Sequence, residues 1–260
     1  MDTAKIGQAI KLLETNIPQN LATLKYLTLY REDTTVNVME EGKGWAVLSL
    51  FPTAILSFDR EAYPRAKVAV FANGTNDTLK LRLLHELPAN NYVLRLNAPL
   101  NLSGLEKRYK VGRGFTYLSY SCSVLPVLPP AKVVAAQSKL TSEAIAMFRQ
   151  NDYTKEELRG YFSNGARWFG YIKDNVIKSI CFTYRDYGSY REIAGVRTLD
   201  TERRKGYAGI VVYSALKYLL GNGLTPRYVT EIKNLNSIRL AESLGMKQFL
   251  KIEHYLLEPK

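Results

Sequence analysis

Cysteine and histidine are scarce in this chain of 260 residues, which has two of each. The two cysteines, Cys122 and Cys181, are too few for the disulfide framework of a small secreted protein, so we expect a reducing, cytoplasmic compartment. Two histidines and two cysteines also leave too few ligands for the usual zinc sites, and we expect no bound metal.

Long apolar runs and blocks of like charge are also missing. The longest apolar stretch, residues 45–58, contains Pro52 and is too short to cross a bilayer, so we expect no membrane span. The first residues include Asp2 and no apolar segment, and we expect no signal peptide. The net charge is +12. Because the basic residues are scattered, this charge favours a basic surface with a site for a polyanionic cofactor, and binding to nucleic acid is the alternative.

Hydrophobic residues make up 46% of the chain, enough for a packed core. A length of 260 residues favours two domains or one large one. Pro126, Pro129 and Pro130 support neither a helix nor a central strand, so we place a boundary there. The prediction is a mixed α/β N-terminal domain over residues 1–128 and a second domain over residues 129–260.

Hydrophobic periodicity assigns both halves to the α/β class. In the first half we expect helices, a hairpin around Gly42–Gly44, and a turn between strands at Gly112–Gly114. The second half reads as β-α-α-β-β-β-α-β-α-β, with a first strand at 132–138 and a capping box at Thr154–Glu157 that starts a helix. This order predicts a mixed, mostly antiparallel sheet flanked by helices.

A basic turn in the second half carries the clearest chemical signal. A β-branched strand, Glu192–Thr198, is followed by the run Arg203-Arg204-Lys205-Gly206-Tyr207-Ala208 and then by a helical pattern. Backbone N–H groups at a helix N-terminus bind phosphate, and a glycine lets the backbone come close because it has no Cβ. The three cations add positive charge.

A second segment follows in the order and spacing expected after such a turn. It contains Asn234, Ser237, Leu240, Gly245 and Met246 in the pattern Asn-x-x-Ser-x-x-Leu-x-x-x-x-Gly-Met. Together the two segments resemble the signatures of the GNAT superfamily of acyl-CoA-dependent N-acyltransferases, with Met246 where Phe is commoner. The resemblance covers about half of the chain, residues 131–260.

The resemblance implies acetyl-CoA as the cofactor and acetyl transfer to a primary amine by direct attack in a ternary complex. By the same resemblance, Glu192 is the general base, and the backbone N–H near Val196 binds the oxyanion. For Glu192, a solvated strand position or a salt bridge is the alternative. The strand splays at Val196–Thr198, where it binds the pantetheine arm. The residues expected to bind the cofactor are Val196, Arg197, Thr198, Arg203, Arg204, Lys205, Gly206, Tyr207, Ala208, Asn234 and Ser237.

The sequence departs from the family at position 241. Many members have a tyrosine there that protonates the departing thiolate, and this chain has Ala241. Tyr255 is our candidate for that role, with Tyr207 as a second, and His254 is a further candidate base. A non-catalytic CoA-binding module is the alternative that Ala241 suggests.

The layout, a half without motifs before a GNAT half, is similar to that of glycine N-acyltransferase-type proteins. This suggests a small amino acid or another small amine as acceptor, and a peptide amine stays open, as does a homodimer. The first half is expected to shape the acceptor site or an interface, and a distant copy of the GNAT fold is an open reading of it.

Overall fold

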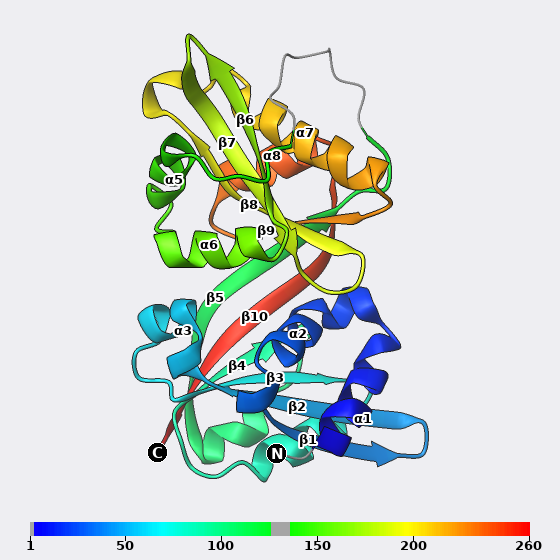
Figure 1. Cartoon of the computed structure of the whole chain (residues 1–260). Helices are drawn as coiled ribbons and strands as arrows, with labels where there is room; N and C mark the ends of the chain where they lie inside the picture. The colour runs from blue at the N-terminus through cyan, green and yellow to red at the C-terminus, as the bar shows by residue number, and fades with distance from the viewer. Residues whose placement is uncertain (1–2, 126–135) are drawn as a thin grey trace. The chain divides into compact units, whose positions relative to one another are not determined.

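The structure of this protein is a computed structural model that describes residues 3–125 and 136–260. It confirms a mixed α/β fold with a large, mostly antiparallel sheet flanked by helices (Figure 1). Contacts group the chain into two compact units. Unit 1 comprises Met1–Tyr117 and Leu250–Lys260, and unit 2 comprises Leu118–Phe249.

Two long strands contribute residues to both units. These are β5, Tyr109–Ser121, and β10, Lys247–Pro259. The predicted division at 128/129 therefore differs from the grouping by contacts, and the boundary at Pro126–Pro130 lies outside the described residues. The turn predicted at Gly112–Gly114 is wrong, because both glycines lie inside β5.

Unit 1 begins with two helices, which are followed by four strands. A third helix lies between the second and third strands, and a fourth helix lies between the third and fourth strands. Its strands are hydrogen-bonded in the order β1-β2-β3-β4-β10-β5, and β3 and β4 are parallel. The bounds are α1 Thr3–Glu14, α2 Ile17–Leu29, β1 Thr35–Glu41, β2 Gly44–Pro52, α3 Ser57–Ala62, β3 Val68–Gly74, α4 Asp77–His85 and β4 Tyr92–Leu96, with short 3-10 turns at Arg31–Asp33, Thr53–Ile55 and Ser103–Lys107.

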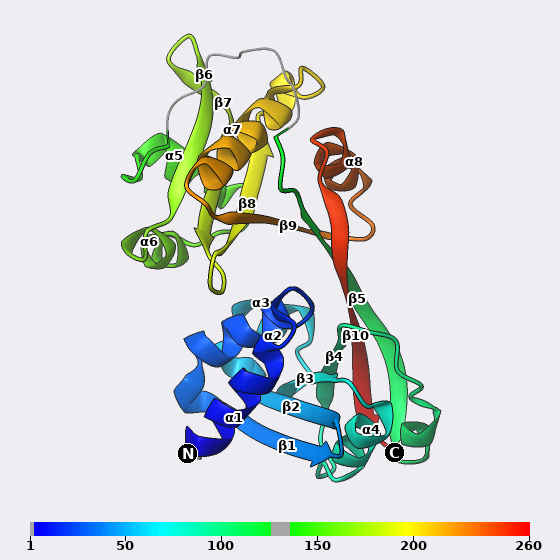
Figure 2. The same ribbon diagram turned by 90° about the vertical axis from the view of Figure 1, so that its right-hand side faces the viewer.

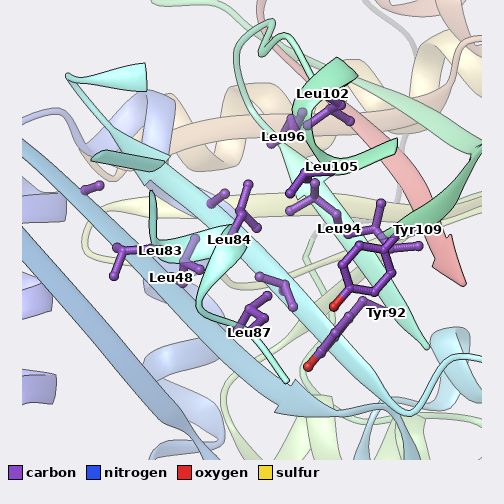
Figure 3. Close-up of a cluster of buried hydrophobic side chains, with 14 of the residues drawn as sticks. Leu48, Leu83, Leu84, Leu87, Tyr92, Leu94, Leu96, Leu102, Leu105 and Tyr109 are labelled. Carbon is purple, nitrogen blue, oxygen red and sulfur yellow. The ribbon is translucent and has the colours of Figure 1, made fainter. Parts of the chain in front are cut away.

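The core of unit 1 is rich in leucine. Leu48 of β2, Leu83 and Leu84 of α4, and Leu94 of β4 gather on one face of the sheet (Figure 3). Leu257 of β10 is buried in the same cluster, although it is only three residues from the C-terminus of the chain. The last strand is therefore part of the core that the first half of the sequence builds.

Unit 2 also has two helices, then three strands, a helix and a fourth strand, but no helix lies between its second and third strands, and a further helix follows its fourth strand, where unit 1 has a 3-10 turn. Its strands are hydrogen-bonded in the order β5-β9-β8-β7-β6, and β8 and β9 are parallel. The bounds are α5 Ser142–Arg149, α6 Lys155–Ser163, β6 Arg167–Lys173, β7 Val176–Arg185, β8 Tyr190–Thr198, α7 Tyr207–Gly221, β9 Thr225–Glu231 and α8 Leu235–Ser243, with a 3-10 turn at Asp200–Glu202.

Local signals explain several boundaries in unit 2. The predicted capping box is present, since the Thr154 hydroxyl accepts from the Glu157 N–H and the Glu157 carboxylate accepts from the Thr154 N–H. Asp174 and Asn175 both adopt positive φ in the β6–β7 hairpin. The strand predicted over 132–138 lies partly outside the described residues, and within them Gln137 forms an isolated bridge with Trp168.

The helices of unit 2 cover both faces of its sheet. Figure 2 shows α5 and α6 on one face and α7 on the other. The α7 face buries Val211, Val212, Ala215, Leu216 and Leu219, a spacing that follows one side of a helix. The α5 and α6 face buries Phe148, Leu158 and Phe182. None of the described helices is both long and apolar enough to cross a membrane.

Candidate functional site

The parallel strands β8 and β9 pair along only part of their length. Their register runs from Tyr190 opposite Thr225 to Ile193 opposite Tyr228, and no pairing beyond that point is recorded in the described residues. Figure 2 shows β9 turning away from β8. The backbone of β8 from Ala194 onward is therefore open along this edge, where an extended ligand can add like a strand.

A β-bulge lies where the two strands part. On the β7 side, Phe182 is opposite Ala194 and Ile180 is opposite Arg197, so Gly195 and Val196 together face Cys181. Gly195 has φ +61°, and a Cβ at this position would lie 2.7 Å from the ring of Phe182. The bulge therefore requires glycine, and it takes Val196 out of the regular ladder.

Side chains hold the residues after the bulge. The Asn151 side-chain amide donates to the Val196 carbonyl at 3.2 Å, and the Ser179 hydroxyl donates to the Arg197 carbonyl at 3.1 Å. The hydroxyls of Ser179 and Thr198 lie 2.8 Å apart. An oxyanion needs a hydrogen-bond donor, and the Val196 N–H lies at the bulge, outside the regular ladder, where it is suited to that role.

The turn before α7 has an unusual backbone. Arg204 has φ +63° and Gly206, the N-cap of α7, has φ +80°. Gly206 supplies no side-chain hydrogen bond to the helix, whereas Asn16, Asn76, Thr141, Thr154 and Asn234 cap α2, α4, α5, α6 and α8. The first N–H groups of the 15-residue α7 are therefore left without a side-chain acceptor, which suits an anion.

Two of the three cations in the turn are already paired. The Arg203 guanidinium lies 2.7 Å from Asp200, and the Lys205 ammonium lies 2.7 Å from Glu202. The hydrogen bond to Glu202 raises the pKa of Lys205. The turn therefore presents less net positive charge than its sequence suggests. Of the three cations in the turn, Arg204 is the one for which no ion pair is recorded in the described part of the chain.

Other predicted residues near the turn contact the protein itself. Arg197 donates to the Gln150 side chain at 3.2 Å and forms an ion pair with Asp200 at 3.3 Å. Tyr207 stacks on Tyr171 of β6, with ring centroids 4.2 Å apart. Ala208 follows it in the first turn of α7 and is partly exposed.

Glu192 lies on β8, four positions before Val196 at the bulge. Its side chain is 15% exposed, and Arg227 of β9 lies directly across the strand pair with Nη1 3.7 Å from the carboxylate. On the other side of β8, Tyr184 of β7 lies opposite Glu192 in the strand register. Burial, and after it the charge of Glu192, raises the pKa of Tyr184 and of Tyr153. Both tyrosines therefore stay protonated near neutral pH, and neither is a base there.

A family comparison agrees with this geometry. The GNAT acetyltransferase family matches residues 133–255, which include the splay, the bulge, the basic turn and α8. This part of the chain belongs to the GNAT superfamily. GNAT acetyltransferases transfer acyl groups from acyl-CoA.

Solved GNAT structures share the fold over the whole chain. A putative GNAT acetyltransferase from Novosphingobium aromaticivorans is 18% identical with a TM-score of 0.52, covering 94% of this chain and 99% of that one. A GCN5-related N-acetyltransferase from Kribbella flavida is 15% identical with a TM-score of 0.56, covering 94% of this chain and 96% of that one. A tandem GNAT protein from the clavulanic acid biosynthesis pathway is 11% identical with a TM-score of 0.52, covering 99% and 95%. No curated protein matches the sequence significantly.

The second GNAT motif forms the start of α8. The Asn234 side chain accepts from the Ser237 N–H at 3.1 Å and so caps the helix. The Ser237 side chain hydrogen-bonds to Tyr228, whose pKa is nevertheless raised, mainly by burial. Ala241 is fully buried in the core beneath α7, and its methyl group cannot donate a proton.

The cap at Asn234 gives a measurable expectation. We expect Asn234→Ala to lower the free energy of unfolding by about 1 kcal/mol, because the Ser237 N–H loses its acceptor, and we expect Asn234→Asp to keep the cap. Thermal unfolding without ligand measures both. If CoA affinity then falls in both variants, the amide contacts the cofactor, whereas a fall in the alanine variant alone limits Asn234 to capping.

The candidate acid and base on the last strand belong to unit 1. The recorded neighbours of Tyr255 are Leu94, Arg113 and Glu253, all from unit 1. His254 is buried, with Nδ1 2.7 Å from the Tyr63 hydroxyl. Burial, and then the charge of Arg95, holds the pKa of His254 well below its usual range. The described contacts bring neither residue together with Glu192.

The position in unit 1 that matches Glu192 has no carboxylate. There β3 and β4 form the parallel pair, and Phe71 lies opposite a buried arginine, Arg95. The helix that follows β3 is capped by the Asn76 side chain and has an acid, Asp77, in its first turn. The segment β3-α4-β4 thus corresponds to β8-α7-β9 of the GNAT unit, but its helix N-terminus is already capped and carries an acid, which disfavours an anion.

Proposed function

We propose that unit 2 binds acetyl-CoA and transfers its acetyl group to a primary amine. The observation that carries the proposal is the combination of an open β8 edge, a bulge at Gly195–Val196 and an uncapped α7 N-terminus in one unit. The pantetheine arm would lie along Val196–Thr198, and the pyrophosphate would lie against the N–H groups from Arg204 to Ala208.

Acyl transfer in this site would proceed by direct attack in a ternary complex. The amine must lose a proton, because a free amine is mostly protonated at neutral pH. Glu192 would accept that proton, through a water molecule, as the new C–N bond forms. The Val196 N–H would stabilise the oxyanion, and the C–S bond would then break. A CoA thiolate leaves without an acid, since a thiol pKa is only about 8.5.

Unit 1 fits a second GNAT-like half that does not bind the cofactor. Its order of elements resembles that of unit 2 apart from the additional helix α3 and the absence of a counterpart to α8, and its third strand has Phe71 where unit 2 has Glu192. We assign to it a role in selecting the acceptor, a small or peptide amine. Cys122 and Cys181 are both free thiols, which suits a reaction in the cytoplasm.

Cofactor binding is tested most directly at Gly206. CoA at 100 times its dissociation constant should stabilise the protein by about 2.7 kcal/mol. Gly206→Val should abolish that shift, because a β-branched side chain strains the positive φ and blocks approach to the backbone. Thermal unfolding with and without CoA measures the effect.

Gly223 provides a matched control at the other end of α7. It has φ +66°, and like Gly206 it has no atom within 4 Å of an added Cβ. Gly223→Val should cost similar stability without ligand and keep the full CoA shift. Equal CoA shifts in the two variants would refute the assignment of the turn. Turnover of acetyl-CoA with a panel of amines then separates an enzyme from the non-catalytic CoA-binding module that Ala241 suggests.

A further inference from the structure

A buried aspartate and arginine lie beside Glu192, and neither is part of the cofactor site. We propose that Asp186 is a positioning residue that holds the Arg227 guanidinium away from Glu192 and so keeps Glu192 basic enough to accept a proton. This inference rests on the proposed role of Glu192 in acyl transfer.

The distances around Arg227 are unequal. Its Nη1 atom lies 2.6 Å from Asp186 Oδ2 and 3.7 Å from Glu192 Oε2. Its Nε and Nη2 atoms donate to the Ser119 hydroxyl at 3.2 and 3.1 Å. Asp186 and Ser119 therefore anchor the guanidinium, while the Glu192 carboxylate lies beyond hydrogen-bonding distance of Arg227 Nη1.

The backbone fixes all of these side chains. Asp186 follows β7, and its N–H donates to the Tyr190 carbonyl at 3.1 Å across the β7–β8 turn. Glu192 and Arg227 are direct partners in the parallel β8–β9 register. The side chains of Asp186 and Arg227 are almost completely buried, at 0% and 5% exposure. A guanidinium in this position has few alternative places to move.

The charges explain why it matters that Arg227 lies closer to Asp186 than to Glu192. Burial lowers the pKa of Arg227, but the carboxylates of Asp186 and Glu192 raise it above its ordinary value, so it stays charged. Asp186 Oδ1 is buried without a hydrogen-bond partner in the described structure, and the ion pair recorded for Asp186 is the one with Arg227. Without Asp186, the guanidinium would pair with Glu192 alone, and a nearby opposite charge makes a carboxylate a weaker base.

Other titratable groups surround this cluster, and they include Glu157, which acts on Tyr153, and Arg185, which acts on Arg191. Tyr184 of β7, Tyr161 of α6 and Tyr153 before α6 form its aromatic surroundings, and Tyr161 and Tyr184 have centroids 4.5 Å apart. Arg191 precedes Glu192 on β8. Burial, the largest cause, lowers the pKa of Arg191, and the charge of Asp186 offsets part of that effect. Asp186 and Arg227 thus set the balance of charge beside the base.

Unit 1 contains a natural comparison. Asp59 and Arg95 form a buried ion pair there too, but the residue across from the arginine is Phe71, which stacks under it with the guanidinium carbon 4.7 Å from the ring centroid. A buried Asp–Arg pair can therefore be purely structural in this fold. The test consequently needs a measurement that a structural role would not change.

The experiment follows the titration of the Glu192 carboxyl carbon by NMR in the full-length protein with CoA, assigned by its loss in Glu192→Gln. Asp186→Asn should move the midpoint to lower pH by about one unit. The acid limb of the pH–rate profile should move the same way, with a lower plateau and an unchanged CoA-induced thermal shift. An unshifted Glu192 midpoint in Asp186→Asn would overturn the proposal.

Two further variants keep the test decisive if Asp186→Asn does not fold. Ser119→Ala should give a smaller shift of the same sign. The neutral double variant Asp186→Asn/Arg227→Gln should return the midpoint to wild type or above, because no cation remains beside Glu192. Asp59→Asn is the matched control, with a buried pair lost and the Glu192 midpoint unchanged. If wild type transfers no acyl group, the proposed function fails, while the NMR titration still decides the role of Asp186.

Discussion

Glu192→Gln is expected to lower turnover by roughly 10²–10⁴-fold, the range for a general base, and to leave CoA affinity unchanged. Glutamine keeps the shape of the side chain but cannot accept a proton from the amine. The remaining rate should also lose its pH dependence near neutrality. Steady-state rates from about pH 6 to pH 9, with the CoA-induced thermal shift measured in parallel, test this expectation.

Glu156→Gln is the control for this substitution. Glu156 is an exposed acid in the first turn of α6, in the same unit, and its loss should leave the rate unchanged at every pH. A Glu192→Gln variant that retains wild-type rates across this range would limit Glu192 to its ion pair with Arg227. Tyr255→Phe is the companion variant, and a wild-type rate would exclude Tyr255 as the acid.

A fragment of residues 131–260 is expected to be insoluble and unable to bind CoA, whereas a fragment of residues 118–249 is expected to fold and bind it. The first fragment lacks Leu118 and Tyr120 of β5, which are buried in the core beneath α7. It also contains Leu257, whose buried neighbours all lie in the first half of the sequence. The second fragment contains every member of both hydrophobic clusters of unit 2.

Circular dichroism, solubility and the CoA-induced thermal shift of the two fragments measure this difference. The division at 128/129 predicts the opposite result, a folded and CoA-binding fragment from 131 to 260. Co-expression of residues 1–125 with 131–260 should restore a soluble complex, because β5 and β10 are then both available. A soluble, CoA-binding 131–260 fragment would show that unit 2 does not depend on β5.

Signals that act within a few residues were readable in the sequence. The capping box at Thr154 and Glu157 and the hairpin around Gly42–Gly44 both lie where the sequence placed them. The turn that ends in Gly206 leads into α7, and Gly206 adopts the left-handed backbone conformation that glycine tolerates without strain. These features depend on the backbone preferences of single residues and on side chains three positions apart.

The partners of the candidate site residues were not readable. Nothing in the sequence pairs Arg227 with Asp186, or places Glu192 across from that arginine, because the three residues meet only through the β7–β8–β9 register. Asp200 and Glu202 likewise reduce the charge of a turn that the sequence presented as three free cations. The roles of Glu192, Tyr255 and the cofactor-binding residues remain predictions.

By itself the sequence determined the α/β class, the superfamily of the second half and the presence of a basic turn before α7. Only the tertiary structure decided which strands complete each unit. Two glycines at 112 and 114 read locally as a turn, yet they continue β5, and the last strand β10 joins the core of unit 1. Strand pairing is a contact between distant segments, and its free energy comes from burying apolar side chains that local periodicity does not assign to a partner.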